Sequence, residues 1–149
     1  MVDRFERFSL AISEINRYWH RLTTQEMEPY GLTGAHCMYL LALARHPEGI
    51  TAPRLCEACD KDKADVSRML SILEARGLVT KDGIGGNRYR GCLRLTPEGQ
   101  TVAEALSRRA ELAVEQAGEG LTERERIIFY TALDTITKNL RRICQEGLQ

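Results

Sequence analysis

The segment CDKDKADVSRMLSILEARGLV, residues 59–79, has the pattern of an amphipathic helix with defined ends. Asp62 is a suitable N-cap with Asp65 three residues later, close to a capping-box arrangement, and Gly77 supplies a C-terminal stop. At 100° per residue, the apolar side chains on one face are Val66, Met69, Leu70 and Leu73. The opposite face holds Ala64, Ser67, Arg68, Ser71 and Ala75.

The small side chains on that second face would let the helix backbone approach another surface closely. The floor of a DNA major groove is such a surface. An ordinary solvated helix rich in serine and alanine has the same composition, so the helix alone leaves both interpretations open.

A predicted β-hairpin follows this helix. Its turn is DGIGGN, residues 82–87, and the alternation of RYRGCLRLT, residues 88–96, places apolar and basic side chains on opposite faces. The apolar face holds Tyr89, Leu93 and Leu95, and the basic face holds Arg88, Arg90 and Arg94. No Gly-Lys-Ser/Thr follows the glycines, so they do not form a P-loop.

Two further helices precede this segment. One is expected after Thr33, running through AHCMYLLALARH to the breaker Pro47, and a short one after Thr51, with Pro53 tolerated in its first turn. Two helices joined by a short turn and followed by a hairpin make a winged helix-turn-helix. We therefore predict this DNA-binding fold for residues 33–96, in which the second helix enters the major groove.

Long amphipathic helices flank this region. Residues 1–30 carry an apolar stripe at spacings of three and four: Phe5, Phe8, Ile12, Ile15, Trp19 and Leu22. Residues 97–149 open at Thr96-Pro97 with a stripe of mostly small residues: Gly99, Val102, Leu106, Ala110, Ala113 and Ala117. A capping box in LTERE then opens a final helix with a seam of Phe129, Leu133, Ile136, Leu140 and Ile143.

One compact winged domain could not cover all three stripes. We expect them to pair with the same helices of a second copy, the alternative being an intramolecular bundle in a monomer. The predicted fold class is thus mainly α with a small β-hairpin wing, in which a winged helix-turn-helix domain is flanked by N- and C-terminal dimerisation helices within a single unit, residues 1–149.

The composition limits the class of protein. The chain has 149 residues, 43% hydrophobic and 28% charged, which indicates a single globular unit. Its formal net charge is zero, yet residues 51–96 hold nine Lys/Arg and six Asp/Glu, a net +3 that suggests an anionic partner. We expect no signal peptide, no membrane span and a cytoplasmic location, because charges interrupt every apolar run.

Catalytic and metal-binding patterns are weak. The sequence has no Gly-x-Ser-x-Gly, no His-Glu-x-x-His and only three histidines. We therefore expect that the protein is not an enzyme and that it binds no cofactor. The CEAC pair, Cys56 and Cys59, lacks a second Cys-x-x-Cys, so no metal site is expected. Cys37, Cys56 and Cys59 are redox candidates, although free cysteine is commonly a small buried apolar residue.

The order of elements, with LTGAHCMYLLAL, DKADVSRMLSILEARGLV and LRLTPEG, resembles the MarR family of transcriptional regulators over nearly the whole chain. The resemblance implies a homodimer on a pseudo-palindromic operator, usually a repressor, often released by a small phenolic or other anionic ligand or by thiol oxidation. Ser67 and Arg68 match the family's recognition-helix contacts, and Thr51 matches the start of the preceding helix. The wing departs from the pattern, because Asn87, Arg88 and Tyr89 stand where the family has Asp, any residue and Arg.

Roles for individual residues follow from their chemistry in such a DNA-binding fold. Ser67, Arg68 and Ser71 would read base edges, with Arg68 directed at a guanine. Lys61, Lys63, Arg88 and Arg90 would neutralise phosphates and make affinity depend steeply on salt. Arg88 or Arg90 would replace the wing arginine of the family pattern, which this sequence lacks.

The resemblance also implies a pocket between the dimer helices and the winged domain. It would be lined by Trp19, His20, His36 and Tyr39, and would take a small aromatic or anionic effector. The alternative is that Trp19 and Tyr39 are core residues and that both histidines are solvated or satisfied by backbone.

Two other functions stay open. The chain is alternatively a thiol-based redox-sensing regulator, or a winged-helix module that binds a protein instead of DNA. Weak salt dependence of binding would favour the protein partner, since phosphate contacts release counterions.

Overall fold

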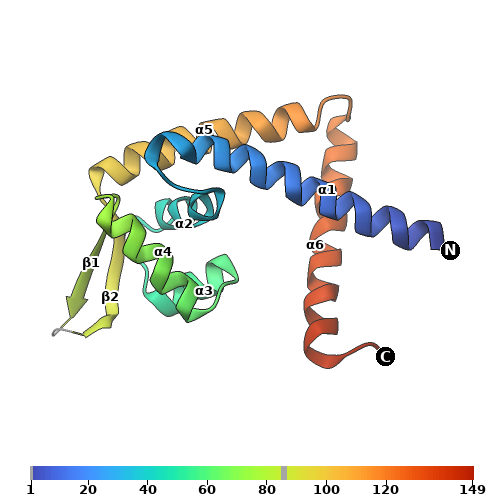
Figure 1. Ribbon diagram of the computed structural model, residues 1–149. Helices are drawn as coiled ribbons and strands as arrows, with labels where there is room; N and C mark the ends of the chain where they lie inside the picture. The colour runs from blue at the N-terminus through green and yellow to red at the C-terminus, as the bar shows by residue number, and fades with distance from the viewer. Residues whose placement is uncertain (1, 85–86) are drawn as a thin grey trace. The chain divides into compact units, whose positions relative to one another are not determined.

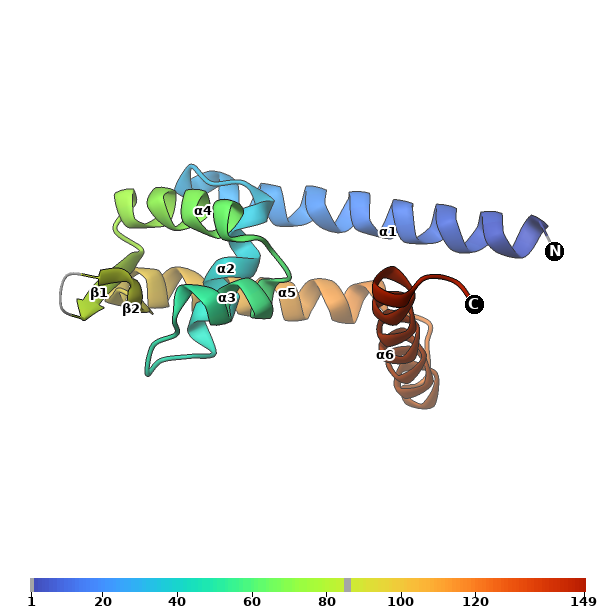
Figure 2. The same ribbon diagram turned by 90° about the horizontal axis from the view of Figure 1, so that it is seen from below.

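The computed structural model describes the backbone of residues 2–84 and 87–149 and the side chains of residues 3–82 and 91–149. In chain order the elements are α1 Val2–Met27, a 3-10 turn Glu28–Tyr30, α2 Gly34–Ala44, α3 Ala52–Cys59, α4 Lys63–Ala75, β1 Val79–Ile84, β2 Asn87–Leu95, α5 Pro97–Ala117 and α6 Glu123–Glu146 (Figures 1 and 2). The helices and the antiparallel hairpin confirm the predicted mainly α fold with a β-hairpin wing. The chain packs as two compact units, Met1–Ala110 and Glu111–Gln149.

The core of the first unit is built around α2. This helix packs against α1, α3, α4 and β2, so apolar side chains are buried on most of its circumference. Tyr39 and Leu40 are fully buried, and Leu55, Leu73 and Leu93 meet them from α3, α4 and β2. Burial of this many large apolar side chains is the main force that holds the helix-turn-helix and the hairpin together.

The ends of α4 lie where the sequence predicts them. Asp62 is the N-cap, and its Oδ1 accepts a hydrogen bond of 2.8 Å from the backbone N–H of Asp65. After Arg76, Gly77 has φ +71°, a left-handed conformation that favours glycine. The N-cap Asp62 and the C-terminal Gly77 therefore fix where this helix begins and ends.

The hairpin is fastened to the helices at its base. Val79 pairs with Leu95 and Lys81 with Leu93, and an isolated bridge joins Ile50 to Leu93. Leu93 is fully buried, as the alternation of the strand predicts. The base of the wing therefore moves with the loop between α2 and α3.

Helix α5 begins directly after β2 and packs closely on the turn that follows α4. The Thr96 hydroxyl donates to the Gly77 carbonyl at 2.7 Å and accepts from the Gly99 N–H at 2.9 Å. A Cβ on residue 99 would overlap the carbonyl oxygen of Leu78, so only glycine fits there. Val102 and Leu106 continue this contact into the core.

This packing corrects the expectation that the whole stripe of α5 pairs with a second copy. Gly99, Val102 and Leu106 are buried within the first unit. The small side chain at residue 99 serves an intramolecular approach of α5 to Leu78, and periodicity alone could not distinguish that from an interface.

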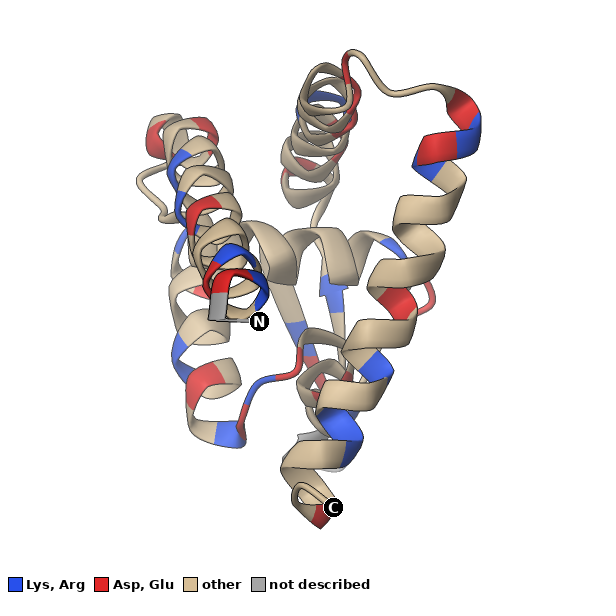
Figure 3. Cartoon of the chain, turned by 90° about the vertical axis from the view of Figure 1, so that its right-hand side faces the viewer, with Lys and Arg blue, Asp and Glu red and all other residues tan. Residues whose placement is uncertain are grey.

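The second unit is dominated by α6. Thr122 and Glu125 form the predicted capping box, with the Thr122 N–H donating to Glu125 at 2.7 Å and the Glu125 N–H donating to the Thr122 hydroxyl at 3.2 Å. Residues 127–133 carry no charge, and this stretch is visible along the helix (Figure 3).

Large apolar side chains of α1 and α6 are exposed in the single chain. On α1 they include all six members of the predicted stripe, with Phe5 at 72% exposure. On α6 they are Ile127, Ile128, Phe129, Tyr130, Leu133, Ile136 and Leu140. Among the residues that the structure describes, every helix is too short or too polar to cross a membrane.

Candidate nucleic-acid interface

The outer face of α4 is exposed and made of small side chains around one arginine, as predicted. Its members are Ala64, Ser67, Arg68, Ser71 and Ala75. The Ser71 hydroxyl donates to the Ser67 carbonyl at 3.0 Å, which leaves its oxygen as an acceptor toward solvent. Val66, Leu70 and Leu73 are buried on the opposite face, so packing in the core fixes which face is presented.

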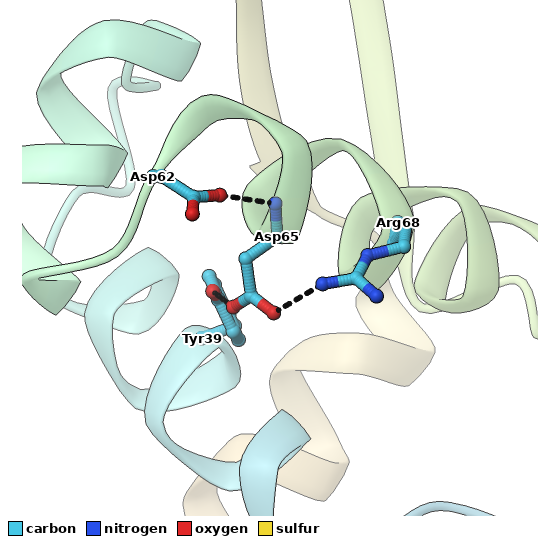
Figure 4. Close-up of polar contacts among 4 residues, drawn as sticks. All are labelled: Tyr39, Asp62, Asp65 and Arg68. Carbon is cyan, nitrogen blue, oxygen red and sulfur yellow. Dashed lines mark hydrogen bonds and ion pairs between the residues drawn. The ribbon is translucent and has the colours of Figure 1, made fainter.

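Arg68 is held by a neighbouring carboxylate. Its Nη2 donates to Asp65 Oδ1 at 3.1 Å, and 74% of the arginine side chain is exposed (Figure 4). The Asp65 side chain is only 23% exposed, because it points back toward α2. The guanidinium therefore stands on the surface while its anchor is mostly buried.

The second oxygen of Asp65 is also occupied. The Tyr39 hydroxyl donates to Asp65 Oδ2 at 2.5 Å, which joins α2 to α4 (Figure 4). Burial raises the pKa of Tyr39 well above its usual range, with the hydrogen bond to Asp65 as the next cause. The phenol is thus a permanent donor at neutral pH.

A small hollow lies beside this face, between the start of α3, α4 and β1. It has a volume of about 80 Å³ and is lined by Ala52, Pro53, Cys56, Lys63, Val66, Ser67, Leu70 and Lys81. It brings Lys63 and Ser67 together with Lys81, a cation that sequence reasoning did not single out. Lys81 of β1 thus adds a positive charge beside the exposed face of α4.

The remaining predicted contacts are distributed around this surface. Thr51 is the N-cap residue of α3, half-buried, and Lys61 lies exposed in the turn between α3 and α4. The predicted contacts Arg88 and Arg90 belong to β2, but their side chains lie outside the described residues.

Arg94 has a structural role on the face expected to be basic. Its Nε and Nη2 donate to the Glu48 carbonyl at 3.2 and 3.0 Å, and its Nη1 lies 3.2 Å from Asp82 Oδ2. This arginine ties the wing to the loop between α2 and α3. Its partner Glu48 is 46 positions away in sequence, so no local pattern could reveal the contact.

A larger cavity opens between α1 and α2. Its volume is about 390 Å³, and the lining residues are Asn16, Trp19, His20, Thr23, Gly34, Cys37, Met38, Leu41, Arg45, Lys61 and Ala110. Trp19 and His20, two residues of the predicted pocket, line this cavity. Arg45 and Lys61 add cationic groups to the wall, and sequence reasoning had not assigned them to a pocket.

The structure corrects the other half of the predicted pocket. His36 is 4% exposed and Tyr39 is fully buried, and both belong to the face of α2 that packs into the core. His36 Nδ1 accepts a hydrogen bond from the backbone N–H of Thr33, whereas Tyr39 binds Asp65. Cys37, Met38 and Leu41 of the same helix face the cavity instead.

The three redox candidates differ in exposure. Cys37 and Cys59 are buried, and burial raises the pKa of both thiols, which lowers the fraction of reactive thiolate. Cys56 is half-buried at the small hollow. Within the described part of the chain, His, Cys, Asp and Glu side chains form no cluster of three that could hold a metal ion.

These features define a winged helix-turn-helix protein: α3 and α4 form the two-helix motif, α4 presents a small-residue face, and β1 and β2 form the wing. Residues 30–86 match the family model of the MarR family. The matched residues contain α2, α3, α4 and β1.

One relative carries the name of a transcriptional regulator. A Thauera aromatica protein, named for a proposed role as transcriptional regulatory protein for the hcr operon, is 30% identical over 105 residues, or 70% of this chain. The match covers 58% of the length of that relative.

Solved structures share the fold. A MarR family transcription regulator has a TM-score of 0.83 at 20% identity, covering 97% of this chain and 95% of its own. A MarR-type regulator from Listeria monocytogenes in complex with 26mer DNA has a TM-score of 0.81 at 24% identity, covering 93% and 94%. The S. aureus MepR-DNA complex has a TM-score of 0.80 at 21% identity, covering 89% and 96%.

Proposed function

We propose that this chain is a sequence-specific DNA-binding transcriptional regulator, not an enzyme, that acts in the cytoplasm as a homodimeric repressor on a pseudo-palindromic operator. The observation that carries the proposal is the exposed face of α4, where small side chains surround Arg68 beside a hollow that holds Lys63 and Lys81. An α-helix with such a face can lie against base edges in the major groove, because short side chains allow close approach.

Each contact has a physical role in this proposal. Arg68 donates to a guanine, with Ser67 and Ser71 hydroxyls beside it on the same face. Lys61 and Lys63, with Thr51 at the start of α3, contact phosphates and fix the register, as do Arg88 and Arg90 from the wing. Phosphate contacts supply salt-dependent affinity, whereas the base contacts supply specificity.

A second copy of the chain would cover the exposed apolar faces of α1 and α6. A soluble monomer rarely leaves so many large apolar side chains in contact with water. Symmetric pairing also gives two recognition helices about 34 Å apart, one turn of DNA.

A small aromatic anion would occupy the cavity between α1 and α2 and relieve repression. Trp19 supplies an aromatic face, and Arg45, Lys61 and His20 surround the space with groups that attract a carboxylate. Such a ligand shifts the protein away from DNA only if it binds the non-DNA arrangement more tightly.

Fluorescence anisotropy on labelled duplexes tests DNA binding directly. The duplex is one selected by the full chain from a randomised pool, with a shuffled duplex of equal composition as the comparison, at several salt concentrations. We expect tighter binding to the selected duplex and a steep negative salt slope. Arg68→Ala should lower affinity for the selected duplex by about 5- to 150-fold, the worth of one bidentate base contact.

Arg108→Ala, on the exposed side of α5, is the matched control and should retain the affinity of the wild type. Benzoate, used as a probe aromatic carboxylate, should weaken binding to the selected duplex in the wild type and less so in Arg45→Ala. Equal binding to both duplexes at every salt concentration would refute sequence-specific DNA recognition and direct attention to a protein partner.

A further inference from the structure

The contact between Asp65 and Arg68 is supported from the interior of the protein. Asp65 accepts from Tyr39 at one oxygen and from Arg68 at the other, while its backbone N–H donates to the N-cap Asp62 (Figure 4). Both carboxylate oxygens and the main chain are therefore fixed. A carboxylate with so many constraints holds a single orientation, unlike an ordinary exposed acidic side chain.

The position of Asp65 is costly for a DNA-reading surface. It places a negative charge on the first turn of the helix that would enter the groove, close to phosphates that repel it. A carboxylate at this place stabilises the helix N-terminus, but Asp62 already supplies the cap. The negative charge of Asp65 instead serves to orient Arg68, to which it is hydrogen-bonded.

We propose that Asp65 is a specificity-determining positioning residue, and that Tyr39 holds it so that the Arg68 guanidinium is oriented for one guanine before DNA arrives. This inference rests on the proposed DNA-binding function. An arginine has several rotatable bonds, and 74% of this side chain is exposed, so without a partner it would sample many orientations. Ordering it in advance removes that entropy cost from the binding step.

The geometry leaves Arg68 able to bind DNA while it is held. Asp65 Oδ1 takes a hydrogen bond from Nη2 only, so the remaining N–H groups of the guanidinium are available for the O6 and N7 of guanine. Bases other than guanine gain less binding free energy from Arg68, since the held guanidinium cannot reorient toward them. Asp65 thereby trades overall DNA affinity for discrimination.

Tyr39 links this device to the core. It is fully buried on α2, and its hydroxyl reaches the carboxylate across 26 positions of sequence. The ring packs in the same way with or without the hydroxyl, so Tyr39→Phe removes the hydrogen bond and keeps the packing. The variant tests the positioning without emptying the core.

The test compares affinities for the selected duplex and the shuffled duplex, and takes their ratio as the measure of discrimination. Asp65→Asn should lower the ratio about 5- to 10-fold, part of the worth of a bidentate guanine contact, while affinity for the shuffled duplex rises or stays constant. Tyr39→Phe should lower the ratio about 2- to 5-fold.

Two variants separate positioning from a structural role. Asp62→Asn removes a charge from the same helix end but retains a good N-cap, so its ratio should equal that of the wild type. In the Arg68→Ala background, Asp65→Asn should change the ratio less than twofold, because the group it orients is gone. Circular dichroism at each step verifies that the helices are intact.

The outcomes distinguish the two proposals. A wild-type chain that prefers neither duplex overturns the proposed function and this inference with it. A wild type with clear preference, together with an unchanged ratio in Asp65→Asn, overturns the inference alone. An equal fall in the affinity ratio from Asp65→Asn in the wild-type and Arg68→Ala backgrounds also overturns the inference. Asp65 would then act through the stability of the fold.

Discussion

The imidazole Nδ1 of His36 accepts a hydrogen bond of 3.1 Å from the backbone N–H of Thr33, which places a histidine in the N3 position of the capping box of α2. An accepting Nδ1 carries no proton. Burial lowers the pKa of His36 below its usual value of 6.5, and Nδ1 can accept from the Thr33 N–H only while the ring is neutral. The neutral ring is therefore part of the fold.

The stability of the chain should depend on pH through this ring. The unfolded chain binds a proton at His36 near pH 6.5, whereas the folded chain binds it only at lower pH. The contribution of neutral His36 to the free energy of unfolding is thus complete above pH 6.5. It is lost as the pH falls toward the lowered pKa. Urea unfolding at fixed protein concentration between pH 5 and 8 measures the effect.

His36→Gln keeps a side-chain acceptor at N3 of the capping box and cannot titrate. Its free energy of unfolding should change less over this range than that of the wild type. A variant that lost stability toward pH 5 as steeply as the wild type would show that other groups control the pH dependence.

Gly99→Ala should destabilise the protein by about 1–3 kcal/mol, since the added methyl overlaps the Leu78 carbonyl. In an ordinary helix interior the same change stabilises by about 0.5–1 kcal/mol, so even the sign is informative. Chemical denaturation gives the value, and Gln100→Ala at the neighbouring exposed position is the control. A gain in stability for Gly99→Ala would contradict the close approach of α5 to Leu78.

Leu133→Glu should dissociate the proposed dimer. Leu133 lies in the uncharged stretch of α6, and a charge there would have to be buried against the second copy. Sedimentation velocity should report a monomer for the variant at concentrations where the wild type is a dimer. Thr135→Glu, on the opposite side of α6 and outside the uncharged stretch, should remain dimeric. A dimeric Leu133→Glu would place the interface elsewhere.

Lys61→Ala should weaken DNA binding without changing its specificity. A phosphate contact contributes equally to any sequence, so both duplexes should lose affinity by the same factor, and the salt slope should fall by about 1. Anisotropy titrations over a salt series give both quantities, with Lys138→Ala on α6 for comparison. Loss on the selected duplex alone would mean that Lys61 reads bases.

Cys37 and Cys59 should react slowly with iodoacetamide in the folded protein. Burial limits access and raises the pKa of both thiols, so we expect alkylation more than about tenfold slower than in urea. Mass spectrometry of timed samples resolves the individual sites. Rapid alkylation of Cys37 or Cys59 in the native chain, with a parallel loss of DNA affinity, would support the redox-sensing alternative.

The sequence predicted those features that depend on neighbouring residues. Asp62 as a cap and the stop at Gly77 are local, and periodicity correctly assigned Val66 and Leu70 to the buried face of α4. The hairpin followed from alternation in the same way. Each of these signals lies within one element, so a single sequence contains it.

Contacts between distant positions could not be predicted in this way. Tyr39 and Asp65 meet through the packing of α2 on α4, and Arg94 reaches Glu48 through the fold of the wing. Helix α2 is apolar on most sides, so its periodicity did not show that His36 faces the core while Met38 faces the cavity. The missing information is tertiary, because it concerns which residues meet only in the folded chain.

Arg94 joins the base of the wing to the helix-turn-helix, so that the two should move together as one rigid body. Because the base of the wing is fastened to the loop that precedes α3, the recognition helix and the wing cannot adjust separately to a displaced DNA site. In a dimer, a change in spacing between the two copies would withdraw base and phosphate contacts of one half-site together. If the chain binds its operator as the proposed dimer, the second half-site would then lose the benefit of its high effective concentration, and release would be abrupt instead of gradual.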